Sequence, residues 1–247
     1  MSDLTRSLIL PDWPAPAAVR ACVTTREGGV SLPPFDTFNL GDHVGDDPAA
    51  VAENRRRLGA AFNIRPAWLK QVHGLSVADA DPSVVAEADA SWTDQPGIAC
   101  TVMTADCLPA LFCDRAGTRV AAAHAGWRGL AGGVLEATLD RLALAPEEVL
   151  VWLGPAIGPQ AFEVGLEVRD AFTAVHPQAA EAFVAGERPG KLIADIYKLA
   201  RIRLAARGVT AVYGGGLCTV SDPRFFSYRR TPQGGRFASL VWLDPTA

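Results

Sequence analysis

Short apolar runs separated by turn residues dominate the middle of the chain. Those at residues 98–104, 108–112 and 120–124 have the length of buried strands and are bounded by glycine, aspartate or proline. Similar runs follow at 149–153, 209–213 and 237–243. We expect these segments to form adjacent strands of one buried sheet.

Helical signals alternate with these runs. Asp47-Pro48 supplies a cap residue and a first-turn proline, and residues 49–62 then read as a helix. The arginines at 55–57 are expected to face solvent, and Asn54 is interpreted as a helix-surface residue or a cap partner. Residues 129–142 predict a second helix after a glycine-rich start. A third apolar face recurs at steps of three and four and ends at Gly208; it comprises Leu192, Ile196, Leu199, Ile202 and Ala206. The mixture predicts an α/β fold.

Composition narrows the class of protein. The chain has 247 residues, is 49% hydrophobic and carries a net charge of −4, with no internal repeat or linker. One large domain spanning residues 1–247 is therefore expected, without a basic face for nucleic acid. No apolar stretch approaches the length of a membrane span, so we expect a cytoplasmic protein. The five cysteines form no CxxC pair and are expected to be reduced thiols.

Two short motifs place reactive side chains at the ends of predicted strands. His124 ends an apolar run and enters the glycine-rich turn HAGWRG, and Cys107 begins a run directly after Asp106 in TADCLP. Strand ends are where open sheets commonly carry functional groups. Cys113 shares a strand face with Cys107 but lies about 20 Å further along, and it is interpreted as a core thiol.

A third motif, LKQVHG, contributes His73. Two imidazoles and a thiolate suit zinc, and three protein ligands leave a fourth position for water or substrate. The separations of 34 and 17 residues between His73, Cys107 and His124 match no compact metal signature. Spacing alone therefore leaves open a core cysteine with hydrogen-bonded histidines.

These three motifs, in this order, resemble the signature blocks of the YfiH/YlmD family, also called the laccase-domain or polyphenol-oxidase-like family. The resemblance extends over nearly the whole chain, through the segments TTREGGVS, FNLGDHVGDD, LGPAIGP, FEVG and FFSYRR. It implies a layered α-β-β-α sandwich of one domain with mixed sheets. It also implies one zinc ion held by His73, Cys107 and His124.

The resemblance implies purine nucleosides and phosphate as substrates. Adenosine, inosine, guanosine and methylthioadenosine would be split by phosphate into base and ribose 1-phosphate, and adenosine would also be deaminated.

For these reactions we single out Asp106 as general acid or base, or as a residue that orients His124 or caps a turn. Phosphate could bind Arg26, Arg229 or Arg230, although paired surface arginines are as consistent with a solvated turn. Asn39 and Gln71 could bind sugar hydroxyls or a purine edge. Trp127, Arg128, Phe225 and Phe226 could stack on the base or belong to the core.

Three other functions compete with this interpretation. The family's older name suggests copper-dependent phenol oxidation, but four histidines are too few for a multicopper centre, so at most one copper could replace zinc. Cys107 with His124 as its base could instead form a cysteine hydrolase or deamidase, which would not need His73. A binding module without turnover would not need an open metal position. We expect a monomer or a weak homo-oligomer.

Overall fold

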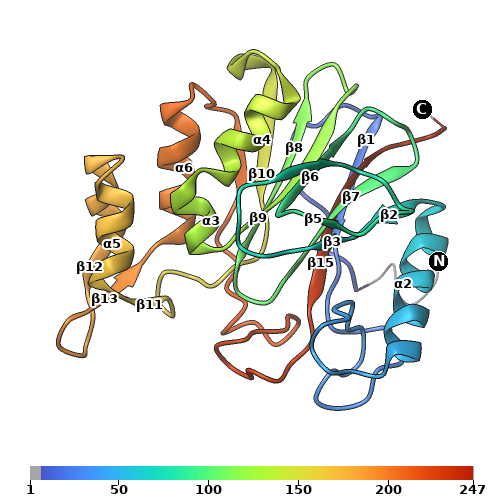
Figure 1. Cartoon of the computed structure of the whole chain (residues 1–247), viewed down its shortest axis with the longest axis horizontal. Helices are drawn as coiled ribbons and strands as arrows, with labels where there is room; N and C mark the ends of the chain where they lie inside the picture. The colour runs from blue at the N-terminus through green and yellow to red at the C-terminus, as the bar shows by residue number, and fades with distance from the viewer. Residues whose placement is uncertain (1–6, 247) are drawn as a thin grey trace.

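The computed structural model describes residues 7–246 and is organised around two large mixed β-sheets (Figure 1). The first has the strand order β1-β15-β7-β2, formed by Val19–Val23, Phe237–Leu243, Ile98–Thr104 and Arg65–Ala67. The second has the order β14-β10-β8-β9-β6-β4, formed by Val212–Gly214, Val149–Leu153, Leu108–Asp114, Val120–Ala125, Ala90–Thr93 and Val77–Asp79. Each sheet contains both parallel and antiparallel neighbours, so the mixed α/β prediction is confirmed.

The helices cover the outer faces of these sheets. Helix α2 (Pro48–Phe62) lies on the side of the four-stranded sheet, and α3 (Trp127–Gly132), α4 (Val134–Leu142) and α6 (Ile196–Ala206) lie on the side of the six-stranded sheet (Figure 1). A lateral group contains α5 (Leu166–Thr173), the 3-10 helix η2 (Pro177–Ala182) and the strands β11 (Glu163–Gly165), β13 (Lys191–Ala194) and β12 (Phe183–Ala185). The remaining elements are β3 (Leu69–Lys70), paired with β5 (Ala86–Glu87), and the 3-10 helix η1 (Pro146–Glu148).

The fold has four layers: α2, the four-stranded sheet, the six-stranded sheet, and the helices α3, α4 and α6. Three apolar cores lie between them. Strand alternation sends successive side chains of one strand into different cores. In β7, Cys100 and Val102 pack between the two sheets, whereas Ala99 and Met103 pack towards α2. Because both faces of the central strands are buried, these strands read as continuous apolar runs in the sequence.

The structure corrects the expectation of one continuous sheet. Strand β7 pairs with β15 and β2, whereas β8 pairs with β9 and β10 in the other sheet. The chain therefore crosses from one sheet to the other through residues 105–107. A strand buried on both faces has no periodicity that tells which sheet it joins.

Two helix predictions also change. The helix expected over 129–142 is divided into α3 and α4 at Gly133, whose φ of 110° is unsuited to a continuous helix. The helix expected from Leu192 begins at Ile196, with the Asp195 carboxylate capping the N–H of Lys198, because Leu192 belongs to β13. Within residues 7–246, no helix has the length and apolar character required to cross a membrane.

Helix α2 differs from its prediction on one face. Asn54 is fully buried, and its side chain bonds the N–H of Val30 and oxygen atoms of Ser31, Thr37 and Asn39. Arg55 is half-buried, with its guanidinium over the ring of Trp68. Asn54 is therefore an interior residue that ties α2 to the loop before it, not a surface residue.

Candidate metal centre and its cavity

His73, Cys107 and His124 converge although they are distant in sequence. One ligand atom from each lies within 4.8 Å of the others, and Cys107 Sγ is 3.8 Å from His73 Nε2. The two imidazole rings meet edge to face, with centroids 4.7 Å apart. Zinc binds nitrogen at about 2.0 Å and sulfur at about 2.3 Å, so the Sγ–Nε2 separation lies within the span of one ion. The donor set fits zinc.

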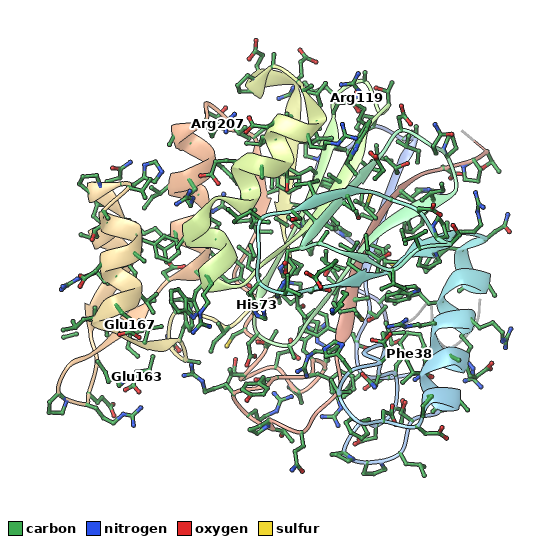
Figure 2. All side chains as sticks on the ribbon, in the orientation of Figure 1. Phe38, His73, Arg119, Glu163, Glu167 and Arg207 are labelled. Carbon is green, nitrogen blue, oxygen red and sulfur yellow. The ribbon has the colours of Figure 1, made fainter. Side chains whose placement is uncertain are left out.

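Each of the three residues has a distinct structural origin. His124 is the penultimate residue of β9, and Cys107 ends the crossing segment directly before β8. His73 lies in the loop after β3, beside α3, with a left-handed φ of 60° (Figure 2). Asp106, next to Cys107, also has a positive φ, 97°. Two non-glycine residues in this sparsely populated region mark the site as conformationally strained.

Glycine is required where the loops meet. A Cβ atom on Gly126 would lie 2.7 Å from His73 Cδ2 and 3.0 Å from Cys107 Sγ. Both distances are too short for a side chain to be accommodated without moving a ligand. The first glycine of HAGWRG, Gly126, therefore allows the start of α3 to approach His73 and Cys107.

Asp89 organises two of the three ligands and was not identified from the sequence. Its buried carboxylate accepts hydrogen bonds from His124 Nδ1 at 2.7 Å and from the N–H groups of Val72, His73 and Gly74. Burial raises the pKa of Asp89, but these hydrogen bonds outweigh burial and lower it below its ordinary value. Since His124 Nδ1 is held by Asp89, its Nε2 faces the site. The only sequence signal was an acidic residue inside the short apolar segment before β6.

The electrostatics favour the metal-binding form of Cys107. Burial raises the pKa of the thiol, but the charges and hydrogen bonds of His124 and His73 outweigh burial and lower it to about 6. Burial lowers the pKa of His124, whereas Cys107 and Asp89 raise it to about 9. A thiolate is both the form that ligates zinc and the form that acts as a nucleophile.

The three ligands line a cavity of about 490 Å³, within the size range of small-molecule sites. Its apolar lining includes Met103, Trp127, Ile157, Phe162 and Ile196. Its polar lining includes His43, Gln71, Asp106, Tyr228 and three arginines, Arg128, Arg229 and Arg236. The cavity can thus hold a ligand with one flat apolar part and one polar or anionic part.

Five other residues singled out in the sequence line this cavity: Gln71, Asp106, Trp127, Arg128 and Arg229. Gln71 bonds the N–H and the carbonyl of Met103 through its amide, so both of its polar atoms already have partners. The Asp106 carboxylate accepts from Thr219 Oγ1 and the N–H of Arg229, each at 2.6 Å. The Arg229 guanidinium bonds the carbonyls of Ala161 and Glu163.

The structure places the remaining candidates away from the cavity wall. Arg26 pairs with Asp36 and stacks on Phe226. Asn39 is fully buried, and its amide bonds Gly41, Asp46 and the N–H of Arg236. Arg230 bonds several backbone carbonyls of the loop at 219–225. Phe225 and Phe226 are buried core residues. The hydrogen bonds and packing of these five residues stabilise loops of the structure, and their side chains do not line the cavity.

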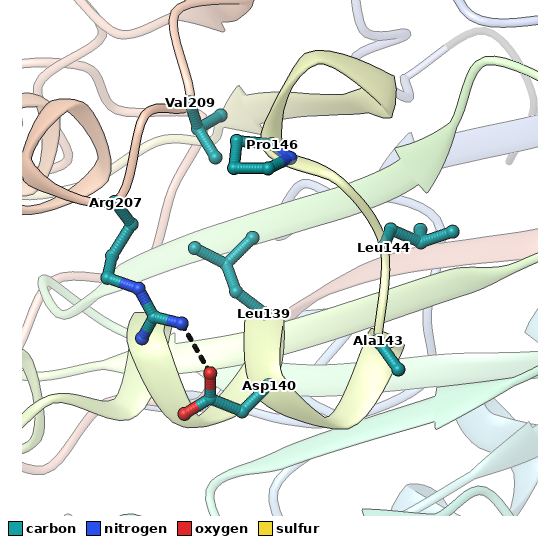
Figure 3. Close-up of a pocket in the computed structure, with 7 residues that line it drawn as sticks. All are labelled: Leu139, Asp140, Ala143, Leu144, Pro146, Arg207 and Val209. Atoms are coloured by element: carbon teal, nitrogen blue, oxygen red, sulfur yellow. Dashed lines mark hydrogen bonds and ion pairs between the residues drawn. The ribbon is translucent and has the colours of Figure 1, made fainter.

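A second, smaller hollow lies beyond the end of α4 (Figure 3). It measures about 190 Å³ and is lined mainly by apolar side chains. Its two charged residues, Asp140 and Arg207, form an ion pair with each other. The cavity at the metal ligands is the better candidate site because it is larger and combines metal ligands with several polar groups.

The fold and the site together define a class: an α/β protein of stacked mixed sheets with two histidines and one cysteine, placed so that they could hold a metal ion, in the wall of a cavity. The family model described as multi-copper polyphenol oxidoreductase laccase matches residues 20–244. The chain belongs to this family, which confirms the resemblance to YfiH and YlmD proteins.

Relatives of known name cover almost the whole chain. Purine nucleoside phosphorylase PA4543 of Pseudomonas aeruginosa is 70% identical, covering 96% of this chain and 98% of the relative. Purine nucleoside phosphorylase YfiH of Escherichia coli is 57% identical over the same shares of both chains. Among solved structures, Neisseria meningitidis protein NMB0706 has a TM-score of 0.94 and 52% identity, covering 96% of this chain and 99% of that one. YlmD of Geobacillus stearothermophilus has a TM-score of 0.89 and 32% identity, covering 97% of each chain.

Proposed function

We propose that this chain is a zinc-dependent purine nucleoside phosphorylase that works as one catalytic domain. The observation that carries the proposal is the convergence of His73, Cys107 and His124 in the wall of a cavity of nucleoside size. The printed names of relatives up to 70% identical support the substrate class. Five free cysteines agree with a reducing cytoplasmic location.

Zinc is proposed because the donor set and its support suit that ion. His73 and His124 offer imidazole nitrogens, Cys107 offers a thiolate, and Asp89 fixes the orientation of His124. Bound there, zinc would supply positive charge that polarises a substrate oxygen or nitrogen. The protein residues hold the ion, position the nucleoside and exclude water.

The cavity lining offers apolar side chains for the base and polar side chains for the sugar and phosphate. The apolar wall with Trp127, Ile157 and Phe162 suits the faces of a purine ring. The polar wall, with Asp106 and the arginines, suits ribose hydroxyls and phosphate. Adenosine, inosine, guanosine and methylthioadenosine share the features that such a cavity recognises, and all four are proposed substrates.

In the proposed reaction, a phosphate oxygen forms a bond to the ribose anomeric carbon as the bond from that carbon to the purine nitrogen breaks. The base leaves with the bonding electron pair and takes up a proton, which gives free base and ribose 1-phosphate. Asp106 is the proposed proton carrier because its carboxylate faces the cavity and is held by Thr219 and the N–H of Arg229. We also propose accompanying adenosine deamination, in which Asp106 moves protons between water and the departing amine.

Chromatography of adenosine and inosine, incubated with the purified protein, tests the proposal. Free base and ribose 1-phosphate are expected only when phosphate is present and zinc is retained, and inosine is expected as a second product from adenosine. Absence of base from every nucleoside, in zinc-loaded protein with phosphate, would refute the phosphorylase assignment. Removal of zinc by a chelator, followed by its return, provides the reversible control.

His73→Ala separates this proposal from the cysteine-hydrolase alternative, and Cys107→Ser tests both, since full activity in that variant would exclude each of them. His73→Ala should lose bound zinc and turnover together, whereas a cysteine hydrolase using Cys107 and His124 would keep its activity without His73. Cys107→Ser should likewise lose zinc and activity. Within residues 7–246, the side chains clustered closely enough to hold a metal are His73, Cys107 and His124, and three ligands are too few for a multicopper oxidase.

A further inference from the structure

The arginines that line the cavity differ from most arginines of the protein. Across residues 7–246, most arginines lie within 4 Å of a carboxylate oxygen, as Arg203 does with Glu136. Arg128, Arg229 and Arg236 form no such ion pair in the described part of the chain, although all three line one cavity. Guanidinium groups that gather around a cavity without carboxylate partners produce a positive potential inside it.

Arg236 is the most deeply placed of the three. It immediately precedes β15 and is half-buried, and its guanidinium lies 5.9 Å from the centre of the Tyr228 ring. Its Nη1 donates to the carbonyls of Gly234 and Gly235. In residues 7–246, no hydrogen-bond partner is found for Nε or Nη2, so one edge of the planar fork remains for a ligand.

Arg236 lines the same cavity as His73, Cys107 and His124. Burial lowers the pKa of Arg236, while the opposing charges of Cys107 and Asp106 raise it. Both groups line the same cavity. Asp106 does not neutralise the fork through a direct bond, because its oxygens accept from Thr219 and the N–H of Arg229.

Arg128 and Arg229 differ in how many hydrogen-bond donors they have left for a ligand. Arg128 is exposed and its guanidinium carbon lies 4.5 Å from the centre of the Trp127 ring. The guanidinium has no hydrogen-bond partner within the described residues, so all of its donors can reach a ligand. Arg229 uses both Nη atoms to bind the carbonyls of Ala161 and Glu163. It therefore holds the cavity wall and contributes charge, but it has fewer donors left for a ligand.

We propose that Arg236 and Arg128 form an oxyanion subsite that binds inorganic phosphate inside the cavity, beside the metal ligands. A tetrahedral dianion matches the free fork of Arg236, and Arg128 can close over it from the rim. The proposal deepens the phosphorylase function and rests on it for the role of the bound phosphate. It transfers the phosphate role from Arg26 and Arg230, which the structure places away from the cavity wall.

Steady-state kinetics of Arg236→Gln in the zinc-loaded protein test this subsite. We expect the KM for phosphate to rise about tenfold or more, as loss of a charge-assisted hydrogen bond predicts, with the nucleoside KM and zinc content unchanged. Arg236→Lys keeps the charge without the fork and should give a smaller rise. Arg201→Gln is the matched control, because Arg201 is also half-buried and bonds the carbonyls of Val212 and Gly214.

Arg128→Gln provides a second test of the subsite that does not depend on whether the Arg236 variants fold. Arg128 is exposed and bonds no other group of the described structure, so its replacement should leave the fold intact and raise the phosphate KM about threefold. An unchanged phosphate KM in both Arg128→Gln and a folded Arg236→Gln would overturn the subsite. An equal rise in Arg201→Gln would also overturn it, since the effect would then be general.

Calorimetric titration of the zinc-loaded protein with inorganic phosphate separates this proposal from the proposed function. Phosphate binding that weakens in Arg236→Gln but not in Arg201→Gln supports the subsite even when no nucleoside is cleaved. If the protein cleaves nucleosides but binds phosphate equally well with and without Arg236, the function is supported and the subsite is refuted. Titration with adenosine 5′-phosphate forms the comparison arm, and binding of that nucleotide without binding of free phosphate would refute inorganic phosphate as the ligand.

Discussion

At the scale of single residues, Asp89 is the side chain on which the geometry of the proposed metal site depends. Asp89→Asn preserves size but replaces one acceptor oxygen with a donor, which opposes donors already placed around it. We expect zinc affinity to fall about 10- to 100-fold, as for other residues that orient metal ligands. Competition with a chromogenic chelator measures this change.

Asp114 offers a matched control for that variant. It is also buried, and its carboxylate accepts from the Thr118 side chain and the N–H groups of Thr118 and Arg119, at the far end of β8 from Cys107. Asp114→Asn should lower stability without changing zinc affinity. Equal zinc affinity in Asp89→Asn and Asp114→Asn would contradict the orienting role of Asp89.

The cysteines separate into reactive and unreactive groups. Burial raises the pKa of Cys22, Cys100 and Cys113 to about 12, so these thiols stay protonated at neutral pH and are shielded from solvent. We expect iodoacetamide to label none of the three in the folded protein at pH 7. Peptide mass spectrometry checks this, with unfolded protein as the control in which all three react.

The sequence singled out the side chains that stand in recognisable motifs and missed those that do not. The motifs around His73, Cys107 and His124 identified a triad that the structure brings together, although the bound ion stays a prediction. Asp89 and Arg236 appear in the sequence as one acidic residue and one basic residue beside strands. Their roles depend on donors from distant loops, which spacing along the chain does not reveal.

At the scale of elements, the clearest test concerns helix α2. Replacing the buried Asn54 with alanine leaves the N–H of Val30 and several oxygen acceptors without their partner. We expect the free energy of unfolding to fall by about 1–3 kcal/mol, measured by urea denaturation. Ala52→Ser, at an exposed position of the same helix, should cost well under about 1 kcal/mol. Similar losses in the two variants would contradict the interior role of Asn54.

The lengths and types of the main elements could be predicted, but their partners could not. Apolar runs at 98–104 and 108–112 identified β7 and β8, yet the pattern is the same whether two strands share a sheet or face each other across a core. The division between α3 and α4 depends on the positive φ of Gly133. Glycine adopts positive and negative φ about equally readily, so its presence in the sequence does not predict the break. Pairing and kinks are set by contacts between segments distant in the chain.

At the scale of the whole molecule, metal binding should contribute to stability. An ion that binds the folded chain and not the unfolded chain adds about 2.7 kcal/mol at a free concentration 100 times its Kd. For a chain of this size we expect a chelator to lower Tm by about 5 to 10 °C. Differential scanning calorimetry of the wild-type protein and of His73→Ala checks this. An equal chelator effect on both would show that the stabilising ion binds elsewhere.

The segment 105–107 has a mechanical consequence. It joins β7 of one sheet to β8 of the other, and Cys107 stands at its end, while His124 belongs to the second sheet and His73 to a loop outside both. An ion held by all three residues would therefore fix the end of this crossing segment to β9 of the second sheet and to the loop that carries His73. With cobalt in place of zinc, movement of the segment or of the His73 loop relative to β9 would alter the ligand spacing, and the colour of the protein would report it.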